Sequence, residues 1–393
     1  MFAVLSSRRK LFAHIVAFLS MVWVAACEPV ALGTSAGGPN INPSEPVAVA
    51  LLVPRGSGNA GDDTLSDSLE KAARLAASDL EGVQIDLRVY GTAGNPAMAQ
   101  EAALQAVSDG AKIILGPVYA ESANAVAVAV ANKGVNVLSF SNNNTIAGGN
   151  LFVLGNTFDS SASRLVHYAA QQGKRSIVIA HDANVPGQLG AQAIQKAAAS
   201  SGTSVVGVVD YELSQTGVLG AVPRIKQSVT DGTADAIFLT ANTAGALPML
   251  GQLLPEQGVS PAEVQFVGLS RWDIPAQAME LPGLQGGWFA IPDPTMTAAF
   301  SSRYQEAYGT VPHAIGGLAY DGIAAIGALV RQGKSNALTA AALTQGAGFQ
   351  GTGGVFRLLA DGTNERGLAV ATIRDKQLVV IDPAPKSFGG IGF

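Results

Sequence analysis

The sequence has few of the residues from which disulfides and metal sites are built. Among 393 residues there is one cysteine, Cys27, so a disulfide or a thiolate metal site within one molecule is excluded. Beyond the N-terminal segment the histidines are His167, His181 and His313, which lie far apart in the sequence. None of them has the spacing of a zinc-binding motif such as H-E-x-x-H. The chain is therefore not expected to bind a metal.

Catalytic motifs are missing as well. A G-x-S-x-G nucleophile elbow needs a strand before it and a helix after it, and no such arrangement is expected here. The stretch "GAGFQG" (346–351) matches G-x-G-x-x-G, but it follows an expected helix instead of a strand. "GALVRQGKS" has five residues between Gly327 and Gly333, where a phosphate-binding loop has four. We predict no catalytic residue, no enzymatic activity and no cofactor.

Basic residues are outnumbered by acidic ones. The chain has 24 Lys and Arg against 29 Asp and Glu, a net charge of −5. Removing the three basic residues at 8–10, which belong to the N-terminal segment, leaves 21 against 29 and a net charge of −8. Because no basic stripe occurs either, nucleic acid is not an expected partner.

The first 27 residues have the pattern of a secretory signal peptide. A basic run (8–10) precedes an apolar stretch (11–26) of about 16 residues, shorter than the roughly 20 that cross a membrane. The final "VAAC" resembles the bacterial lipobox, which predicts that Cys27 is lipidated and anchors the chain. In the lipoproteins of enteric bacteria an Asp after this cysteine favours retention in the inner membrane; this chain has Glu28 there, so the resemblance implies the outer membrane. Residues 28–46, rich in glycine and proline, are predicted to form a flexible tether.

From residue 47 onward, apolar runs alternate with stretches of helical periodicity. This alternation predicts βαβ units, in which a mostly parallel sheet has helices on both faces. The first series has expected strands at 47–53, 84–90, 112–115 and 135–140, and expected helices at 65–80, 95–108 and 120–133. The second has expected helices at 160–171, 187–200, 220–229 and 244–256, and strands at 176–181, 205–210, 235–240 and 264–268. The two series predict an α/β fold with two Rossmann-like, doubly wound lobes.

The remaining C-terminal part is too short for a third lobe. It contains expected helices at 295–308, 314–332 and 336–344 and a hairpin at 368–374 and 377–381. We expect these elements to complete the first two lobes, so that the chain crosses between the lobes more than once. The predicted division is 47–156 plus 291–345 for the first lobe and 157–290 plus 346–382 for the second.

Five stretches in this order resemble type I periplasmic binding proteins of the leucine/isoleucine/valine-binding class. They are "VAVALLVPRGSG", "DGAKIILGPVYAESANAVA", "GVNVLSFSNN", "SIVIAHDANVPG" and "GLAYDGIAAI", and the resemblance extends from Val47 to Ile381. It implies two lobes joined by multiple crossovers and a ligand held between them. A narrower set, "VLSFSNN", "GGWFAIPDP", "AYDGIAAI" and "GTGGVFRLLADGTNERGLAV", resembles alphaproteobacterial lipoproteins described as penicillin-binding-protein activators.

The candidate ligand-binding residues follow from the sheet topology. In doubly wound sheets, ligands bind outside the carboxyl ends of the strands. In the first lobe this rule selects Arg55, Gly56, Ser57, Pro117, Val118, Tyr119, Ser141, Asn142 and Asn143. In the second lobe it selects Asp182, Asn242, Thr243, Arg271 and Trp272, although Trp272 fits the core equally well.

The candidate site departs from the pattern of the family's amino-acid receptors. These receptors hold the ligand carboxylate with a serine at the start of the helix after Gly-Pro, where this chain has Ala120 followed by Glu121. Pro186 occupies the position of their tyrosine, and Arg271 lies near the position of the acidic residue that binds the ligand ammonium. The resemblance therefore implies a poor fit for a branched-chain amino acid. An acidic or sugar-like ligand fits better, and so does the absence of any ligand.

Two functions remain open at this point. The first is a solute receptor that binds a small polar ligand of the amino-acid or cell-wall-fragment class and delivers it to an ABC permease. The second is a penicillin-binding-protein activator, an interaction protein that regulates a peptidoglycan synthase. Both imply a lipid-anchored protein that faces the periplasm.

Overall fold

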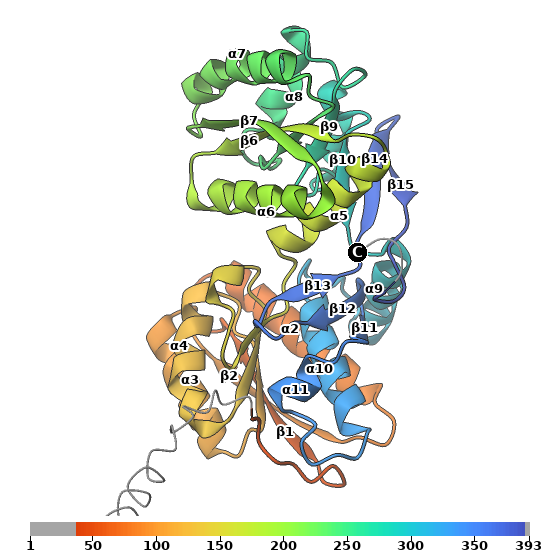
Figure 1. Cartoon of the computed structure of the whole chain (residues 1–393). Helices are drawn as coiled ribbons and strands as arrows, with labels where there is room; N and C mark the ends of the chain where they lie inside the picture. The colour runs from red at the N-terminus through yellow and green to blue at the C-terminus, as the bar shows by residue number, and fades with distance from the viewer. Residues whose placement is uncertain (1–36, 390–393) are drawn as a thin grey trace, which may run out of the picture.

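The computed structural model describes residues 37–389, which form two α/β lobes, one above the other in Figure 1. The predicted signal peptide and Cys27 lie outside the described residues. Within residues 37–389 no helix is long and apolar enough to cross a membrane.

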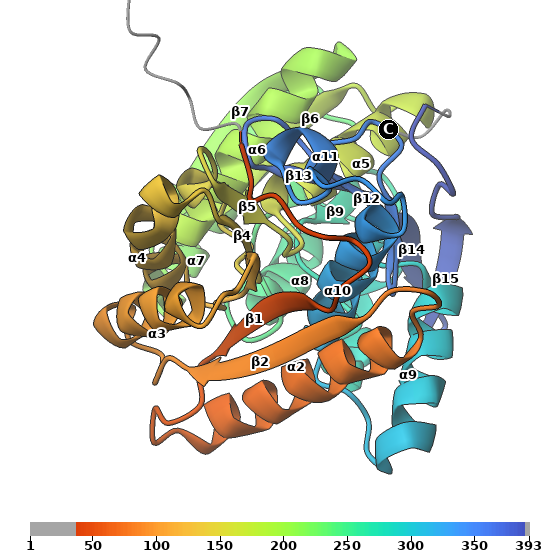
Figure 2. The same ribbon diagram turned by 90° about the horizontal axis from the view of Figure 1, so that it is seen from below.

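The first lobe contains a parallel sheet with the strand order β2-β1-β3-β4-β5. Its strands are β1 (Val47–Val53), β2 (Ile85–Gly91), β3 (Ile113–Leu115), β4 (Asn136–Ser139) and β5 (Leu151–Val153). Its helices are α2 (Ala60–Ser78), α3 (Pro96–Ser108), α4 (Ala120–Val130), α10 (Gly317–Val330) and α11 (Ala340–Leu343), with 3₁₀ turns η1 (Ala131–Lys133) and η2 (Asn144–Ile146). Figure 2 shows this lobe from below, with α3 and α4 on one side and α10 on the other.

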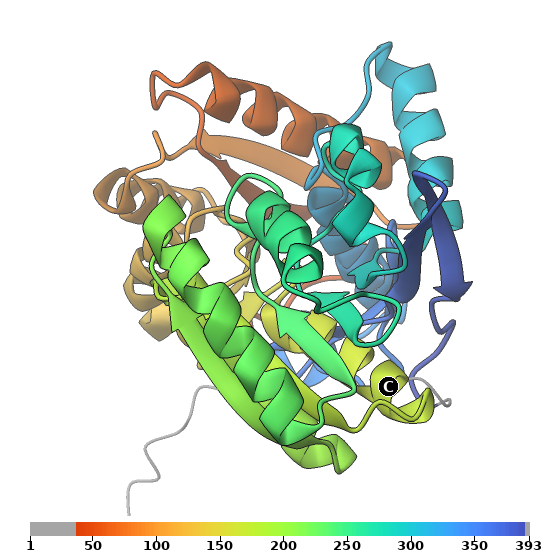
Figure 3. The same ribbon diagram turned by 90° about the horizontal axis from the view of Figure 1, so that it is seen from above.

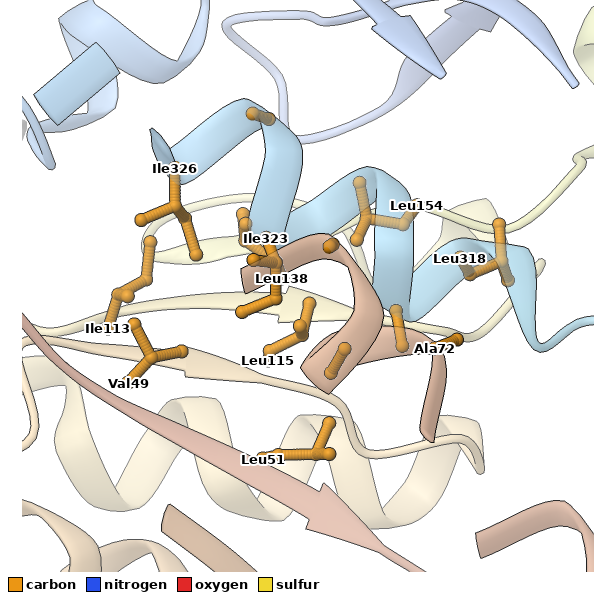
Figure 4. Close-up of a cluster of buried hydrophobic side chains, with 14 of the residues drawn as sticks. Val49, Leu51, Ala72, Ile113, Leu115, Leu138, Leu154, Leu318, Ile323 and Ile326 are labelled. Carbon is orange, nitrogen blue, oxygen red and sulfur yellow. The ribbon is translucent and has the colours of Figure 1, made fainter. Parts of the chain in front are cut away.

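The apolar run of β1 is buried because helices cover both faces of the sheet. Val49 and Leu51 point into one core with α2 and α10, and Ala50 and Leu52 point into a second core with α3 and α4. Figure 4 shows the first of these cores, where Ile323 of α10 lies above the sheet.

The second lobe contains a larger mixed sheet with the order β15-β14-β10-β9-β8-β6-β7. Its strands are β6 (Ser176–Asp182), β7 (Ser204–Tyr211), β8 (Ala236–Leu239), β9 (Gln265–Gly268), β10 (Trp288–Ile291), β14 (Ala369–Arg374) and β15 (Gln377–Asp382), and the last two pair antiparallel. Its helices are α5 (Phe158–Gln171), α6 (Val185–Ser201), α7 (Gln215–Gly232) and α8 (Leu247–Glu256), with 3₁₀ turns η3 (Ala276–Glu280) and η4 (Pro282–Leu284). Figure 3 shows this lobe from above, with the green α7 across it.

The chain crosses between the lobes after β5, after β10 and after β13. The second crossing leads into α9 (Pro294–Tyr308), which packs against α2 of the first lobe. A small antiparallel sheet of β11 (Phe349–Gly351), β12 (Gly354–Leu358) and β13 (Asn364–Arg366) precedes the third crossing. The predicted fold class, with two lobes and several crossings, is confirmed.

Two predicted boundaries differ from the structure. Residues 346–366 were expected in the second lobe, but Phe349 and Phe356 of the small sheet belong to the core of the first lobe. This segment has very short strands among glycines and gave no periodic signal. The predicted tether also ends earlier than expected, because Ile41 is buried in the same core and its N–H donates to the carbonyl of Ser335 at 2.9 Å.

Candidate ligand-binding cleft

A cavity of about 1100 Å³ lies between the two lobes. It is lined by loops that follow β3, β4 and β5 in the first lobe, by the start and one face of α6 in the second lobe, and by the crossing segments. Because both sheets direct the carboxyl ends of their parallel strands toward this space, loop residues of both lobes meet there.

The Gly-Pro corner after β3 forms one wall. Gly116 has a φ of +94°, and a Cβ at this residue would lie 2.3 Å from the carbonyl oxygen of Leu52, so the close approach to β1 requires glycine. The Gly116–Pro117 peptide bond is cis. Helix α4 then begins after Tyr119, which provides no side-chain cap, and Ala120 lines the cavity. The first N–H groups of this helix therefore have no side-chain acceptor, and they favour a negatively charged group.

Tyr119 lies at the edge of the cavity and is held by the first lobe. Its hydroxyl donates to Asp62 on α2. This hydrogen bond to a carboxylate, together with partial burial, raises the pKa of Tyr119 to about 12. The phenol is therefore neutral at physiological pH and fixed in orientation.

The loop after β4 brings five polar residues to the cavity, Ser141, Asn142, Asn143, Asn144 and Thr145. The Oγ of Ser141 accepts the N–H of Asn143, and the Oδ1 of Asn143 accepts the N–H of Thr145, so both side chains stabilise the loop. Asn144 donates to Asp159 at 2.7 Å. Asn142 is exposed in the cavity. Among these residues Asn142 has an amide that is free to contact a ligand.

Charged groups in the cavity are paired within the protein. Apart from His313, the charged residues among its described lining are Asp159, Lys196, Arg271, Asp321 and Arg366. Lys196 bonds to Asp159 at 3.0 Å, Arg271 bonds to the neighbouring Asp273, and Arg366 bonds to Asp321 at 3.1 Å. No carboxylate in this lining is left to bind a ligand ammonium.

The Asp321–Arg366 pair lies at the floor of the cavity and is almost completely buried. The exposed fractions of the two side chains are 1% and 6%. Asp321 also accepts the N–H of Thr352 at 2.6 Å, and Arg366 donates from Nε to the carbonyl of Leu154 at 3.0 Å.

The structure brings six of the predicted ligand-binding residues to the cavity. They are Val118, Tyr119, Ser141, Asn142, Asn143 and Arg271. The other eight, Arg55, Gly56, Ser57, Pro117, Asp182, Asn242, Thr243 and Trp272, are not part of its lining.

Other interactions and burial account for three of the residues outside the cavity. Arg55 forms ion pairs with Asp67 at 2.7 Å and Glu70 at 3.0 Å, and its charge is satisfied within α2. Asp182 is buried, and burial raises the pKa of its carboxyl. Thr243 donates to the carbonyl of Ile274.

Trp272 lies in the core of the second lobe and not in the cleft. Its indole is completely buried and stacks on Phe289, with the ring centroids 6.0 Å apart. A Cβ on Gly268 or on Gly287 would lie 2.1 Å from the indole, so these two glycines make room for it. The core interpretation of Trp272 is therefore the correct one.

Sequence reasoning missed the apolar part of the cavity. Phe158, Leu189 and Phe300 line it together with the predicted loops. They come from helices, and Phe158 and Phe300 lie just after the first and second crossings. The signal that could have found them is their position beside a crossing, where the two lobes meet.

Comparisons with known proteins agree with this architecture. A family model described as a periplasmic binding protein matches residues 46–377. No curated protein matches the chain.

Solved structures of solute-binding proteins have a similar fold. A branched-chain amino acid ABC transporter protein from Rhodospirillum rubrum has a TM-score of 0.72 at 19% identity, covering 86% of this chain and 100% of that one. An ABC transporter substrate-binding protein from Desulfitobacterium hafniense in complex with Leu has a TM-score of 0.63 at 19% identity, with coverages of 86% and 100%. A solute-binding protein from R. palustris in complex with benzoate has a TM-score of 0.56 at 15% identity, with coverages of 88% and 99%. The chain therefore belongs to the periplasmic binding protein family.

Proposed function

We propose that this protein is a solute receptor that binds a small ligand between its lobes and delivers it to an ABC permease. The observation that carries the proposal is the cavity of about 1100 Å³ where the loops of both lobes meet. Its two walls belong to separate lobes, so a hinge motion can close them on a ligand.

The chemistry of the lining selects a class of ligand. The uncapped start of α4 and the Asn142 amide favour a carboxylate or another hydrogen-bond acceptor. Phe158 and Phe300 offer contacts to an apolar body. Asp159 and Asp321 already form ion pairs with side chains of the protein. The ammonium group of a ligand would therefore lose its water in the cavity without gaining a carboxylate partner. We therefore propose a small carboxylate that has an apolar body and lacks an ammonium group.

The location and the anchor belong to the same proposal. Lipidation of Cys27 holds the receptor at the membrane, with the lobes in the periplasm and the outer membrane as the favoured site. No catalytic role is proposed for any residue.

Thermal unfolding with a matched pair of ligands tests the proposed class. Leucine and 4-methylpentanoate differ only in the ammonium group, and benzoate provides an aromatic carboxylate. A ligand at 100 times its Kd stabilises the folded state by about 2.7 kcal/mol. We expect 4-methylpentanoate or benzoate to raise the melting temperature by several degrees and leucine to raise it less. A larger shift with leucine would contradict the proposed class, and no shift with any small solute would contradict the receptor.

The penicillin-binding-protein activator is the second candidate. It is favoured by the complete internal pairing of the five charged groups in the cavity, which leaves the cleft stable without a ligand. Retention of a bifunctional peptidoglycan synthase on immobilised protein, combined with no thermal shift by small solutes, would support this candidate over the receptor.

A further inference from the structure

The C-terminal segment returns from the second lobe to the first. After β15 ends at Asp382, residues 383–389, here named the C-terminal strap, lead away from the sheet and lie beside the junction of the lobes (Figure 1). This passage comes in addition to the crossings after β5, β10 and β13.

The strap begins on the second lobe. Arg164 of α5, which is 5% exposed, bonds to Asp382 at 2.5 Å and to the carbonyl of Pro383 at 3.4 Å. The same guanidinium donates from Nε to the carbonyl of Leu368, just after the third crossing. Ala384 is 6% exposed and belongs to the apolar core that contains β8 and β10. The first half of the strap is thus fixed to the second lobe.

The strap ends on the small sheet of the first lobe. The guanidinium carbon of Arg357, on β12, lies 4.6 Å from the centroid of the Phe388 ring. The same ring packs on Gly348, where a Cβ would lie 2.6 Å from it. Phe349 and Phe356 attach this sheet to the core of the first lobe. The second half of the strap is thus fixed to the first lobe.

The connection between the two attachment points is short and stiff. Three residues, 385–387, separate Ala384 from Phe388, so their Cα atoms can be at most about 14 Å apart in a fully extended chain. Pro383 and Pro385 each fix one backbone dihedral and reduce the freedom of the strap further. The strap therefore limits how far the lobes can separate on its side of the hinge.

The strap is also connected to the floor of the cavity. Arg357 forms an ion pair with Glu365 of β13. On the same strand, Asn364 donates to the carbonyls of Val153 and Gly155, at the first crossing. The next residue but one, Arg366, lines the cavity. Strand β13 is bonded to the first crossing and leads into the third. It therefore connects the strap to both crossings.

We propose that the C-terminal strap is a hinge restraint, which ties the second lobe to the small sheet of the first lobe and limits the opening of the cleft. The strap is attached to the first lobe by the contacts of Phe388 with Arg357 and Gly348. Loss of this contact shifts the population of lobe arrangements toward more open ones.

Distances between spin labels on the two lobes test the restraint without any ligand, so the result does not depend on the proposed function. Asn124 on α4 and Gln195 on α6 are exposed and lie on opposite lobes. In the full chain carrying Cys27→Ser, labels are attached through Asn124→Cys and Gln195→Cys. Pulsed electron paramagnetic resonance then gives the distribution of label distances.

The expected result is a longer and broader distribution after Phe388→Ala, after Arg357→Gln, and after removal of residues 386–393. Phe388→Tyr keeps an aromatic ring and restores the original distribution. Lys386→Ala, at an exposed position of the strap, and Glu365→Gln, which removes the ion pair of Arg357 but keeps its contact with the ring, leave the distribution unchanged. Circular dichroism confirms that each variant is folded.

The proposal would be overturned if Phe388→Ala, Arg357→Gln and the chain without residues 386–393 all fold and keep the wild-type distribution of label distances. An equal change after Glu365→Gln would also overturn it, because the ion pair and not the strap would then hold the hinge. If Phe388→Ala fails to fold, Arg357→Gln decides the question from the other side of the contact.

Discussion

The buried ion pair at the floor of the cavity gives a prediction of known sign and size. Asp321→Asn leaves Arg366 charged, 94% buried and without its carboxylate. Removing one partner of a buried pair costs about 3–5 kcal/mol. The Asn side chain can still accept the N–H of Thr352, and Arg366 keeps its bonds to the carbonyl of Leu154. We therefore expect a value at the lower end of this range, a loss of about 3 kcal/mol in the free energy of unfolding.

Removal of both charges distinguishes the ion pair from other effects of the substitution. In Asp321→Asn/Arg366→Met no charge is left buried, and the main remaining loss is the unsatisfied carbonyl of Leu154, about 1–2 kcal/mol. The double variant should thus be more stable than Asp321→Asn alone. Glu365→Gln is the matched control, because its pair with Arg357 is partly exposed and is expected to contribute less than about 1 kcal/mol.

Urea unfolding followed by circular dichroism measures these differences by linear extrapolation. A loss below about 1 kcal/mol for Asp321→Asn would refute the reasoning, since the buried cation would then not need its partner. A double variant as unstable as the sum of the two single variants would refute it as well, because the two residues would not be coupled.

Three further predictions concern the walls and the hinge of the cleft. Gly116→Ala should destabilise the first lobe by at least about 2 kcal/mol, because the new Cβ would lie 2.3 Å from the carbonyl oxygen of Leu52 and the φ of Gly116 is +94°. An unchanged midpoint of unfolding in urea would contradict this prediction. The pKa of Tyr119 is raised to about 12, so the contribution of its hydrogen bond to stability should be complete below pH 10 and be lost as the pH rises toward 12. The ultraviolet titration of tyrosinate, compared with that of Tyr119→Phe, measures the titration midpoint of this residue. A midpoint near the ordinary tyrosine value of 10.0 would contradict the prediction. Asn364→Ala removes two buried hydrogen bonds at the first crossing and should lower the free energy of unfolding in urea by about 2–3 kcal/mol. Asn142→Ala, in the exposed loop, should lower it little. Equal losses in the two variants would show that Asn364 does not stabilise the hinge.

The sequence predicts the two lobes well because their strands have strong local signals. The run 47–53 is apolar at nearly every position, and β1 occupies the same residues. Loops that follow such strands reach the same edge of a sheet, which is why Tyr119 and Asn142, both selected by this rule, line the same cavity. Strands of three residues, such as β5 and β11, give too little pattern to be recognised.

Long-range pairing explains the residues that were placed incorrectly. Arg55 and Trp272 follow strands, as ligand-binding residues do, but Arg55 is bound by acidic residues of α2, and Trp272 fills a space left by two glycines on neighbouring segments. Neither partner is apparent from spacing in the sequence. The same holds for Arg366, which reaches the cavity from a segment that was expected in the other lobe.

The central claim is that a small carboxylate binds in the cavity between the lobes. Calorimetric titration with 4-methylpentanoate and with benzoate tests it most directly, using the wild type, Asn142→Trp, which replaces the amide that faces the ligand with a bulky indole, and Asn124→Trp, an exposed position outside the cavity. We predict one-to-one binding of at least one of these acids to the wild type and to Asn124→Trp, and no binding to Asn142→Trp. Absence of heat from both acids with the wild type, or equal binding by Asn142→Trp, would contradict the account.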